Sequence, residues 1–400
     1  MSSFGGKFKE IPGISVDRFD CNNLNSEAYF LSHCHQDHMV GLDISEFQES
    51  LKQRNCFIYV SQVTKAILKQ LYPDIGSQIR ELDFYNPTTI HLKKNNISVI
   101  PIPSAHCPGS VMFLFELENS INILYTGDYR INSNDFRKIK ALYNSLGNLK
   151  SIYKIYLDTT FFSKSYLQFP SREKSLDEIC NLIQEWITKS EKHIVNIKTS
   201  ARYGYEYVFM EIYRRFRMPV HVNEKAFAFY SLIPDMDESI SLDSSKTKIH
   251  SSCGSNFMNI CLANKKMYPT RVIKMSAMRW KTKDLNNGIT SDNQYGTHFV
   301  CYSTHASYEE GVELIKFLKP QEIEPCVLSL DDKVNTEMFN TIENLLSCET
   351  EPICKRPKLF NIDKIQNEPM KHMEHIHGDS CNDILFESAL ESPPRIEVLD

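Results

Sequence analysis

Ala28-Tyr-Phe-Leu-Ser-His33-Cys-His35-Gln-Asp37-His38 carries the strongest structural and chemical signal in this 400-residue chain. An apolar, strand-forming run leads directly into three histidines and one aspartate within six positions. Side chains two residues apart in an extended segment point the same way, so His33 and His35 can hold one metal ion while Asp37 and His38 turn toward a second. Imidazole nitrogens with a carboxylate oxygen suit zinc, and such a site can convert water into a nucleophile at neutral pH. The alternative, a few surface histidines before a loop, leaves this spacing unexplained.

Further polar residues occupy the same kind of position, directly after a short strand-like segment. With His33 they make six strand ends, which predicts strands that converge on one rim, where turns expose side chains above a buried sheet. The additional residues are Asp17, His106, Asp128, Asp158 and His305.

Two ions can be assigned to these side chains. A second ion would use Asp37 and His38 with Asp128 as a bridge, so that the pair clamps a hydroxide and a phosphoryl oxygen. The first ion would take a mixed donor set: His33, His35, His106 and Asp128.

Three more residues are expected to support this catalytic centre. Asp17 and Asp158 are placed to accept hydrogen bonds from imidazole N–H groups, and His305 is placed to protonate a leaving oxygen. The alternatives are loop caps for the two aspartates and an ordinary buried histidine for His305.

Composition limits the way in which the chain can meet a nucleic acid. The net charge is −5, so any such contact must come from a local basic patch. Residues 265–283 hold seven basic residues and no acid, and Tyr268 and Trp280 within them could stack on unpaired bases. The alternative is a solvated basic surface. The candidate DNA contacts are Lys265, Lys266, Arg271, Lys274, Arg279, Trp280, Lys281 and Lys283.

The start of the chain is polar and Gly-rich, and no stretch approaches the roughly 20 apolar residues of a membrane span. We therefore expect a soluble, intracellular, monomeric protein whose twelve cysteines are free thiols or metal ligands. His221, His250, Cys253 and Cys261 could form a structural zinc site, although their spacing is loose. Lys355-Arg-Pro-Lys358 is a short candidate for nuclear import, and the histidines at 372–377 are expected to be solvated.

Hydrophobic patterning divides the chain into regions that differ in their expected secondary structure. Short strands fill the first 160 residues, helices and strands alternate after Pro170, and regular texture returns at Thr297. From about residue 349 the chain is polar and interrupted by prolines, which predicts a disordered tail. The individual expectations include helices at 62–72, 205–216 and 333–346, a helix after 171 with a Ser175–Glu178 capping box, a helix capped by Ser307 and Glu310, and a strand at 326–330.

Four segments together resemble the metallo-β-lactamase nucleases of the β-CASP branch. They are Ala28 to His38, His106-Cys-Pro-Gly-Ser-Val-Met-Phe-Leu-Phe, Leu124-Tyr-Thr-Gly-Asp-Tyr-Arg and Tyr156-Leu-Asp-Thr-Thr. The resemblance implies an α/β fold, an αββα metallo-β-lactamase sandwich interrupted by an α/β β-CASP domain. The corresponding domains are 1–160, 161–290 (the β-CASP domain), 291–348 (the returning part) and the tail, 349–400.

The same resemblance assigns roles to the polar residues. It makes Asp17, Asp37, Asp158 and His305 catalytic, besides the metal ligands named above. RNA-processing members carry a further histidine after a late strand, and Val327-Leu-Ser-Leu has none, which resembles the DNA-processing branch and predicts weaker binding of the second ion, for which Mg²⁺ or Mn²⁺ could replace Zn²⁺.

The implied function is a nuclear, metal-dependent DNA nuclease that opens hairpins and trims overhangs during non-homologous end joining. DNA is the expected partner, with DNA-dependent protein kinase and end-joining ligase factors implied by resemblance. The alternatives are a 5′-exonuclease of interstrand cross-link repair, an RNA-processing nuclease, and a non-catalytic β-CASP scaffold. A small-ester or lactam hydrolase would have no use for the inserted domain and its basic strip.

Overall fold

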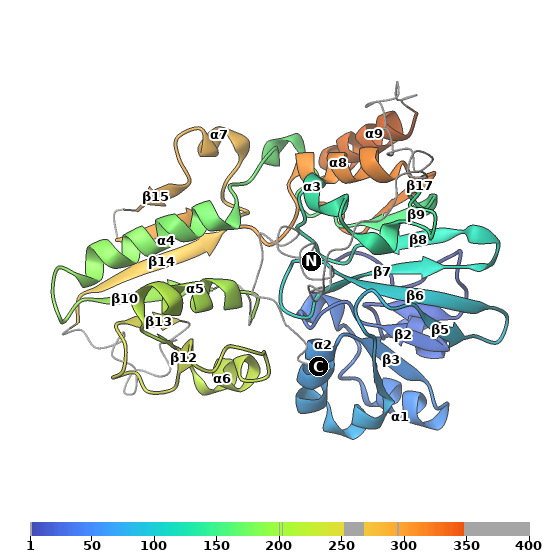
Figure 1. The fold of residues 1–400 in the computed structure, drawn as a ribbon, viewed down its shortest axis with the longest axis horizontal. Coiled ribbons are helices and arrows are strands. Elements are labelled where there is room, and N and C mark those ends of the chain that lie inside the picture. The colour runs from blue at the N-terminus through green and yellow to red at the C-terminus, as the bar shows by residue number, and fades with distance from the viewer. Residues whose placement is uncertain (1, 200, 202, 252–267, 294–295, 348–400) are drawn as a thin grey trace, which may run out of the picture.

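The computed structural model describes residues 2–199, 201, 203–251, 268–293 and 296–347. Several expectations lie outside these residues and stay predictions: the disordered tail, the cysteines at 253 and 261, and the lysines at 265 and 266. Figure 1 shows two halves side by side, with the blue and cyan elements and the last, dark orange helices in one half and the bright green and yellow elements in the other.

Two sheets face each other in the first half. The smaller sheet is parallel, in the order β1 (Ile14–Val16), β2 (Ala28–Phe30), β3 (Phe57–Val60) and β4 (Ile79–Glu81). The larger, mixed sheet has the order β17 (Glu322–Pro325), β9 (Ile152–Leu157), β8 (Asn122–Tyr125), β7 (Val111–Glu116), β6 (Asn96–Pro103) and β5 (Thr88–His91).

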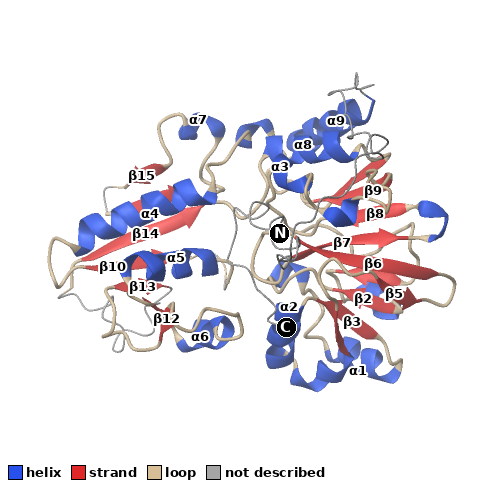
Figure 2. Ribbon diagram, viewed as in Figure 1, coloured by secondary structure: helices blue, strands red, loops and turns tan. Residues whose placement is uncertain are grey.

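Helices cover the outer faces of both sheets (Figure 2). A core between the sheets joins Val16 and Phe30 of the smaller sheet to Phe113 and Tyr125 of the larger one. The helices α1 (Ser45–Gln53) and α2 (Gln62–Leu71) pack in a second core that includes the smaller sheet. The helices α3 (Ser133–Phe136), α8 (Tyr308–Leu318) and α9 (Asp332–Ser347) pack in a third core with the larger sheet. The layers are therefore helix, sheet, sheet, helix, as the αββα prediction requires.

The second half contains a seven-stranded sheet. Its helices are α4 (Arg172–Ile187), α5 (Glu206–Phe216), α6 (Glu224–Tyr230) and α7 (Thr282–Leu285). All strand pairs are parallel except that of β15 with β16. The order is β12 (Ile240–Ser241), β11 (Val220–His221), β13 (Ile249–Ser251), β10 (Ile194–Lys198), β14 (Thr270–Ser276), β16 (Thr297–Cys301) and β15 (Thr290–Asp292). Because β16 pairs with β14, we propose that the returning part of the first domain starts after Cys301 and not at 291.

Several local predictions can be compared with the backbone. The capping box of Ser307 and Glu310 is confirmed at the start of α8. The box of Ser175 and Glu178 is wrong, because Ser171 caps α4 and Ser175 lies inside the helix. The strand at 326–330 is also wrong: β17 ends at Pro325, and the N–H groups of Val327 and Leu328 donate to the side-chain oxygens of Thr159 and Ser3.

None of the described helices is both long and apolar enough to cross a membrane. Each cysteine that the structure describes is a free thiol: Cys21, Cys34, Cys56, Cys107, Cys180, Cys301 and Cys326.

Candidate metal centre

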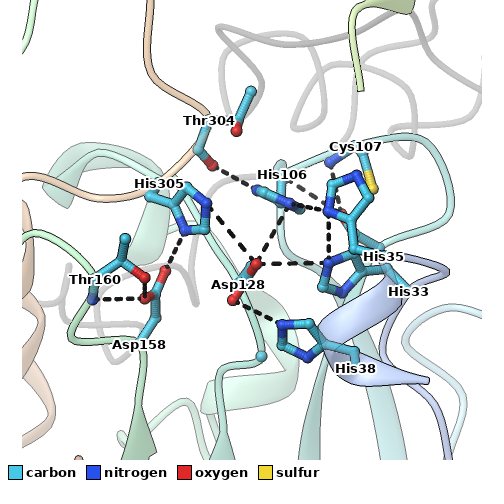
Figure 3. A network of polar contacts seen from close by, with 12 residues as sticks. His33, His35, His38, His106, Cys107, Asp128, Asp158, Thr160, Thr304 and His305 are labelled. Carbon is cyan, nitrogen blue, oxygen red and sulfur yellow. Dashed lines mark hydrogen bonds and ion pairs between the residues drawn. The ribbon is translucent and has the colours of Figure 1, made fainter. Parts of the chain in front are cut away.

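The predicted rim exists, because polar side chains that follow six strands meet there. Figure 3 shows those of His33, His106, Asp128, Asp158 and His305. His33 and His35 follow β2, and the turn Gln36–His38 continues directly from them. Asp17, His106, Asp128 and Asp158 follow β1, β6, β8 and β9, and His305 follows β16 of the other half. The strands are buried because their apolar side chains form the cores, so only their ends can present polar groups to one cavity.

Four ligand atoms lie at the spacing of a tetrahedral metal site. Nδ1 of His35 is 3.0 Å from Nε2 of His33 and 3.0 Å from Nε2 of His106. Oδ2 of Asp128 lies 3.5 Å from both Nε2 atoms. Zinc bonds of about 2.0–2.1 Å in a tetrahedron place neighbouring ligand atoms roughly 3.3 Å apart. His33, His35, His106 and Asp128 therefore fit a single zinc-sized ion.

The outer nitrogens of the three rings fix which inner nitrogen carries a lone pair. His35 Nε2 lies 3.2 Å from the Tyr203 carbonyl and His106 Nδ1 lies 2.9 Å from the Thr304 carbonyl. A carbonyl only accepts, so each of these nitrogens carries the hydrogen and the inner one does not. His33 Nδ1 likewise faces Ser32 Oγ, whose own hydrogen goes to Asp17. Three lone pairs that converge at 3.0 Å repel one another unless a cation lies between them, so the residues fit a metal ion.

The pKa shifts of His35, His106 and Asp128 agree with this arrangement. Burial, helped by the neighbouring His33, lowers the pKa of His35 to about 3, and burial lowers the pKa of His106 well below its usual value. Both rings are therefore neutral, as metal ligands must be. Burial alone would raise the pKa of Asp128, but His38 and His305 outweigh it and keep this carboxyl ionised.

Asp17 is the hydrogen-bond acceptor beneath the cluster. Its Oδ2 accepts from His38 Nδ1 at 2.8 Å, Ser32 Oγ at 2.6 Å and the Tyr125 hydroxyl at 2.7 Å. Its Oδ1 accepts from the Ser32 N–H at 2.7 Å. The bond from His38 Nδ1 to Asp17 turns the other ring nitrogen, Nε2, toward Asp128 Oδ1 at 3.2 Å. This Nε2 atom is buried and has no hydrogen-bond partner among the described residues.

The side chains expected at the second ion lie further apart. Asp37 Oδ2 is 3.9 Å from His38 Nε2 and accepts the Ser2 N–H at 3.0 Å. Among the described residues, Asp37, His38 and Asp128 do not form a group whose ligand atoms all lie within 4.8 Å of one another. The other compact group there is Asp128, Asp158 and His305.

His305 stands beside the cluster and is held by Asp158. Its Nδ1 lies 2.9 Å from Asp158 Oδ2, while Oδ1 of that carboxylate accepts from the backbone N–H and the hydroxyl of Thr160. The other ring nitrogen, Nε2, lies 3.8 Å from Asp128 Oδ2. Burial lowers the pKa of His305, but Asp128 and Asp158 more than offset this and raise it to about 9.

A cavity of about 330 Å³ opens over these groups and lies between the two halves. The first half contributes His35, Asp37 and Asp128 to its lining, among others. The second half contributes Tyr203 and Ser276, which closes the other side. A site of this shape can admit an extended polar chain between the halves.

The residues predicted to bind a structural zinc ion or DNA lie outside this cluster. His221 and His250 lie on the neighbouring strands β11 and β13 with their Nδ1 atoms 3.1 Å apart, while the two cysteines lie outside the described residues. Arg271 is buried, where it pairs with Glu185 and packs on the Trp186 ring.

Trp280 is only 3% exposed and Arg271 is also buried, so neither is open to DNA in this structure, contrary to the expectation for both. For Arg271, burial follows from strand alternation, since residues two apart on β14 share a face and Arg271, Ile273 and Met275 all point inward. The remaining described members, Lys274, Arg279, Lys281 and Lys283, are exposed.

Sequence patterns missed several groups that hold the cluster together. Ser2, Tyr203 and Thr304 act through a backbone N–H or carbonyl, which every residue has, so residue identity gave no signal. Tyr125 could have been suspected, because a tyrosine in a buried strand needs a partner for its hydroxyl.

The fold and the site together define a metal-dependent hydrolase of the metallo-β-lactamase class. Comparison with known proteins narrows this class. The family model "DNA repair metallo-beta-lactamase" matches residues 234–330. "Protein artemis" of Mus musculus is 32% identical over 423 residues, which cover 100% of this chain and 57% of the mouse protein. The Homo sapiens protein of that name is 32% identical over 429 residues, covering 100% of this chain and 58% of its own length.

A second group of relatives is more distant. The "DNA cross-link repair 1A protein" of Homo sapiens is 28% identical over 341 residues, covering 80% of this chain and 30% of that protein. The chain is an Artemis-like protein of the β-CASP, DNA repair branch of the metallo-β-lactamase family. It spans little more than half the length of the mammalian Artemis proteins that it matches.

Proposed function

We propose that this chain is a metal-dependent DNA nuclease that cuts phosphodiester bonds during double-strand-break repair by non-homologous end joining. It would act as an endonuclease on hairpins and overhangs and as a 5′-exonuclease on single strands. The observation that carries the proposal is the convergence of three imidazole lone pairs and the Asp128 carboxylate on one point at the floor of the cavity. The similarity to the Artemis proteins supports DNA as the substrate.

The metal site would supply the electrophile. A zinc ion held by His33, His35, His106 and Asp128 would polarise a phosphoryl oxygen and make water a stronger nucleophile. A second, weaker ion (Zn²⁺, Mg²⁺ or Mn²⁺) would be held by Asp37 and His38, with Asp128 shared, and the looser spacing of these groups supports the weaker binding.

Residues of the chain provide the proton transfer and its alignment. His305 would donate a proton from Nε2 to the departing 3′ oxygen, because Asp158 holds the opposite nitrogen and that face of the ring lines the cavity. The products would carry 5′-phosphate and 3′-hydroxyl ends. Asp17 would keep His38 in one tautomer and orientation.

Exposed cations near the cavity would contact the DNA backbone. Lys274 lies on β14 two residues before Ser276, which lines the cavity, so its Cα is about 7 Å further along the strand. The guanidinium of Arg279 lies 4.0 Å from the centre of the ring of Phe299, which pairs with Lys274 across β14 and β16. Lys281 and Lys283 are exposed as well. These exposed cations would bind phosphates through counterion release.

The similarity to the Artemis proteins also leads us to propose protein partners and a cellular location. A nuclear location, and contacts with DNA-dependent protein kinase or end-joining ligase factors, are what an Artemis-like role would require. The structural zinc site on His221 and His250 is likewise part of the proposal, because these rings lie side by side on β11 and β13.

The test is metal analysis combined with a substrate panel. Purified protein is assayed on a 5′-blocked DNA hairpin, on 5′ and 3′ overhangs, on single strands and on a matched RNA, before and after chelation and re-addition of zinc, manganese or magnesium. We expect metal-dependent opening of the hairpin and little cutting of RNA. Metal-free, folded protein that cuts nothing with any of these ions would overturn the proposal.

The same panel tests the second candidate, a 5′-exonuclease of interstrand cross-link repair, which the 28% identity to the cross-link repair protein favours. An obligate exonuclease leaves the blocked hairpin intact but degrades a 5′-phosphorylated strand. A scaffold without catalytic function would cut neither, although it would still bind the ions.

A further inference from the structure

The backbone in front of His106 adopts a conformation that its residue disfavours. Ala105 has a φ of +54°, in the left-handed region where a Cβ is crowded and glycine is preferred. The flanking backbone is held within its own loop, because Ser104 N–H donates to the Ser110 carbonyl and His106 N–H donates to Ser110 Oγ. These bonds leave the Ala105 carbonyl to be held by another group.

That group is Arg172, the first residue of α4 in the other half of the molecule. Its Nη2 donates a hydrogen bond to the Ala105 carbonyl. The side chain is only 4% exposed, and its Nε has no hydrogen-bond partner among the described residues. A buried cation with so few partners is expensive, and an apolar side chain of the same size would usually be tolerated as well or better. Stability is therefore a poor explanation for an arginine at this position.

A neighbouring arginine acts on the same loops. Arg130, two residues after Asp128, donates Nη1 to the Ser303 carbonyl at 2.9 Å and Nη2 to the Pro170 carbonyl at 2.8 Å. Ser303 precedes Thr304, whose carbonyl accepts from His106 Nδ1 at 2.9 Å. The His106 ring is thus held by Thr304 on its outer nitrogen, while the backbone before it is held by Arg172 (Figure 3 shows the ring contact).

We propose that Arg172 is a positioning residue for the metal centre: by holding the Ala105 carbonyl it keeps the left-handed turn that aims His106 at His33, His35 and Asp128. The inserted half would thereby control metal affinity without touching the ion. The proposal rests on the metal site proposed above. Its main readout uses zinc alone and no DNA, so its failure can be told apart from failure of the nuclease assignment.

The experiment compares zinc affinity, by competition with a chromophoric chelator, among full-length variants. Arg172→Met should bind zinc about 10- to 100-fold more weakly than the parent while unfolding at the same or a higher temperature. Ala105→Gly should match the parent. The double variant Arg172→Met with Ala105→Gly should recover most of the lost affinity, because glycine adopts this turn without help. Lys174→Met, an exposed change on the same helix, is the matched control and should have no effect.

Each alternative result is informative. Parental zinc affinity in folded Arg172→Met would overturn the proposal. Equal weakness in the single and double variants would also overturn it, since Arg172 would then not act through Ala105. If Arg172→Met does not fold, Arg172→Lys provides the comparison: an ammonium group donates to the same carbonyl with one point of contact. We then expect a smaller loss of zinc affinity that Ala105→Gly abolishes, and a loss that Ala105→Gly leaves unchanged would refute the proposal.

Discussion

Replacing Asp17 with asparagine tests the hydrogen-bond acceptor beneath the metal centre. Asp17 has a φ of +54°, which asparagine tolerates nearly as well, so the backbone should be undisturbed. The carboxylate accepts from four donors: the Ser32 N–H and hydroxyl, the Tyr125 hydroxyl and His38 Nδ1. An asparagine side chain has one oxygen, so its NH₂ group must face at least one of these donors.

The size of the effect follows from that mismatch. One buried donor without an acceptor costs about 1–3 kcal/mol, which should appear as lower stability of the metal-free protein. The lost negative charge also makes the rings of His33 and His38 poorer ligands, and loss of such an outer contact weakens metal binding about 10- to 100-fold. In free energy of zinc binding this is roughly 1.4–2.8 kcal/mol.

Two assays measure these terms separately. Denaturant unfolding of the metal-free protein gives the stability difference, and chelator competition gives the zinc affinity. Tyr125→Phe is the matched control, because it removes a single donor and leaves the carboxylate to bind the other three. Asp17→Asn protein that holds zinc as tightly as the parent would refute the role of Asp17.

Three further predictions follow from the site and its surroundings. His305→Ala should slow cleavage about 10²- to 10⁴-fold with unchanged zinc content, measured by single-turnover kinetics; a loss of zinc would instead make it a ligand. Lys274→Glu should weaken DNA binding in a salt-dependent way, whereas Arg271→Ala should lower only thermal stability, because its guanidinium is buried against Glu185; titration with labelled DNA at several salt concentrations distinguishes them. Burial raises the pKa of Glu206 to about 7, so the folded state holds that proton more tightly than the unfolded one, and stability should fall by about 3 kcal/mol as pH rises from 4.5 to 7. Glu206→Gln should flatten that part of the stability curve, and an unchanged curve would contradict the assignment.

The layered fold could be foreseen from sequence because its strands are short, buried and β-branched, as in Ile14–Val16 and Ile152–Leu157. β4 and β5 escaped notice because most of their side chains are partly or fully exposed, as in Thr88–His91, which weakens the apolar signal. The metal ligands could be foreseen because histidine and aspartate at strand ends have few other uses there. Which residues of the basic strip are buried could not be foreseen, because charge alone does not show which face of β14 packs inward.

The contacts that complete the metal centre explain why neither half of the molecule suffices. The first half supplies the ligand rings, but a ring needs an acceptor for its outer N–H to turn the other nitrogen toward an ion. For His35 and His106 these acceptors are the carbonyls of Tyr203 and Thr304, in segments that follow strands of the seven-stranded sheet. Separation of the halves would leave the His35 ring free to rotate or change tautomer, and it would detach Thr304 from β16, the strand that precedes it. The second sheet would therefore contribute to metal binding as well as to the cavity, and a substrate chain lying between the halves would contact the elements that keep the candidate ligands aligned.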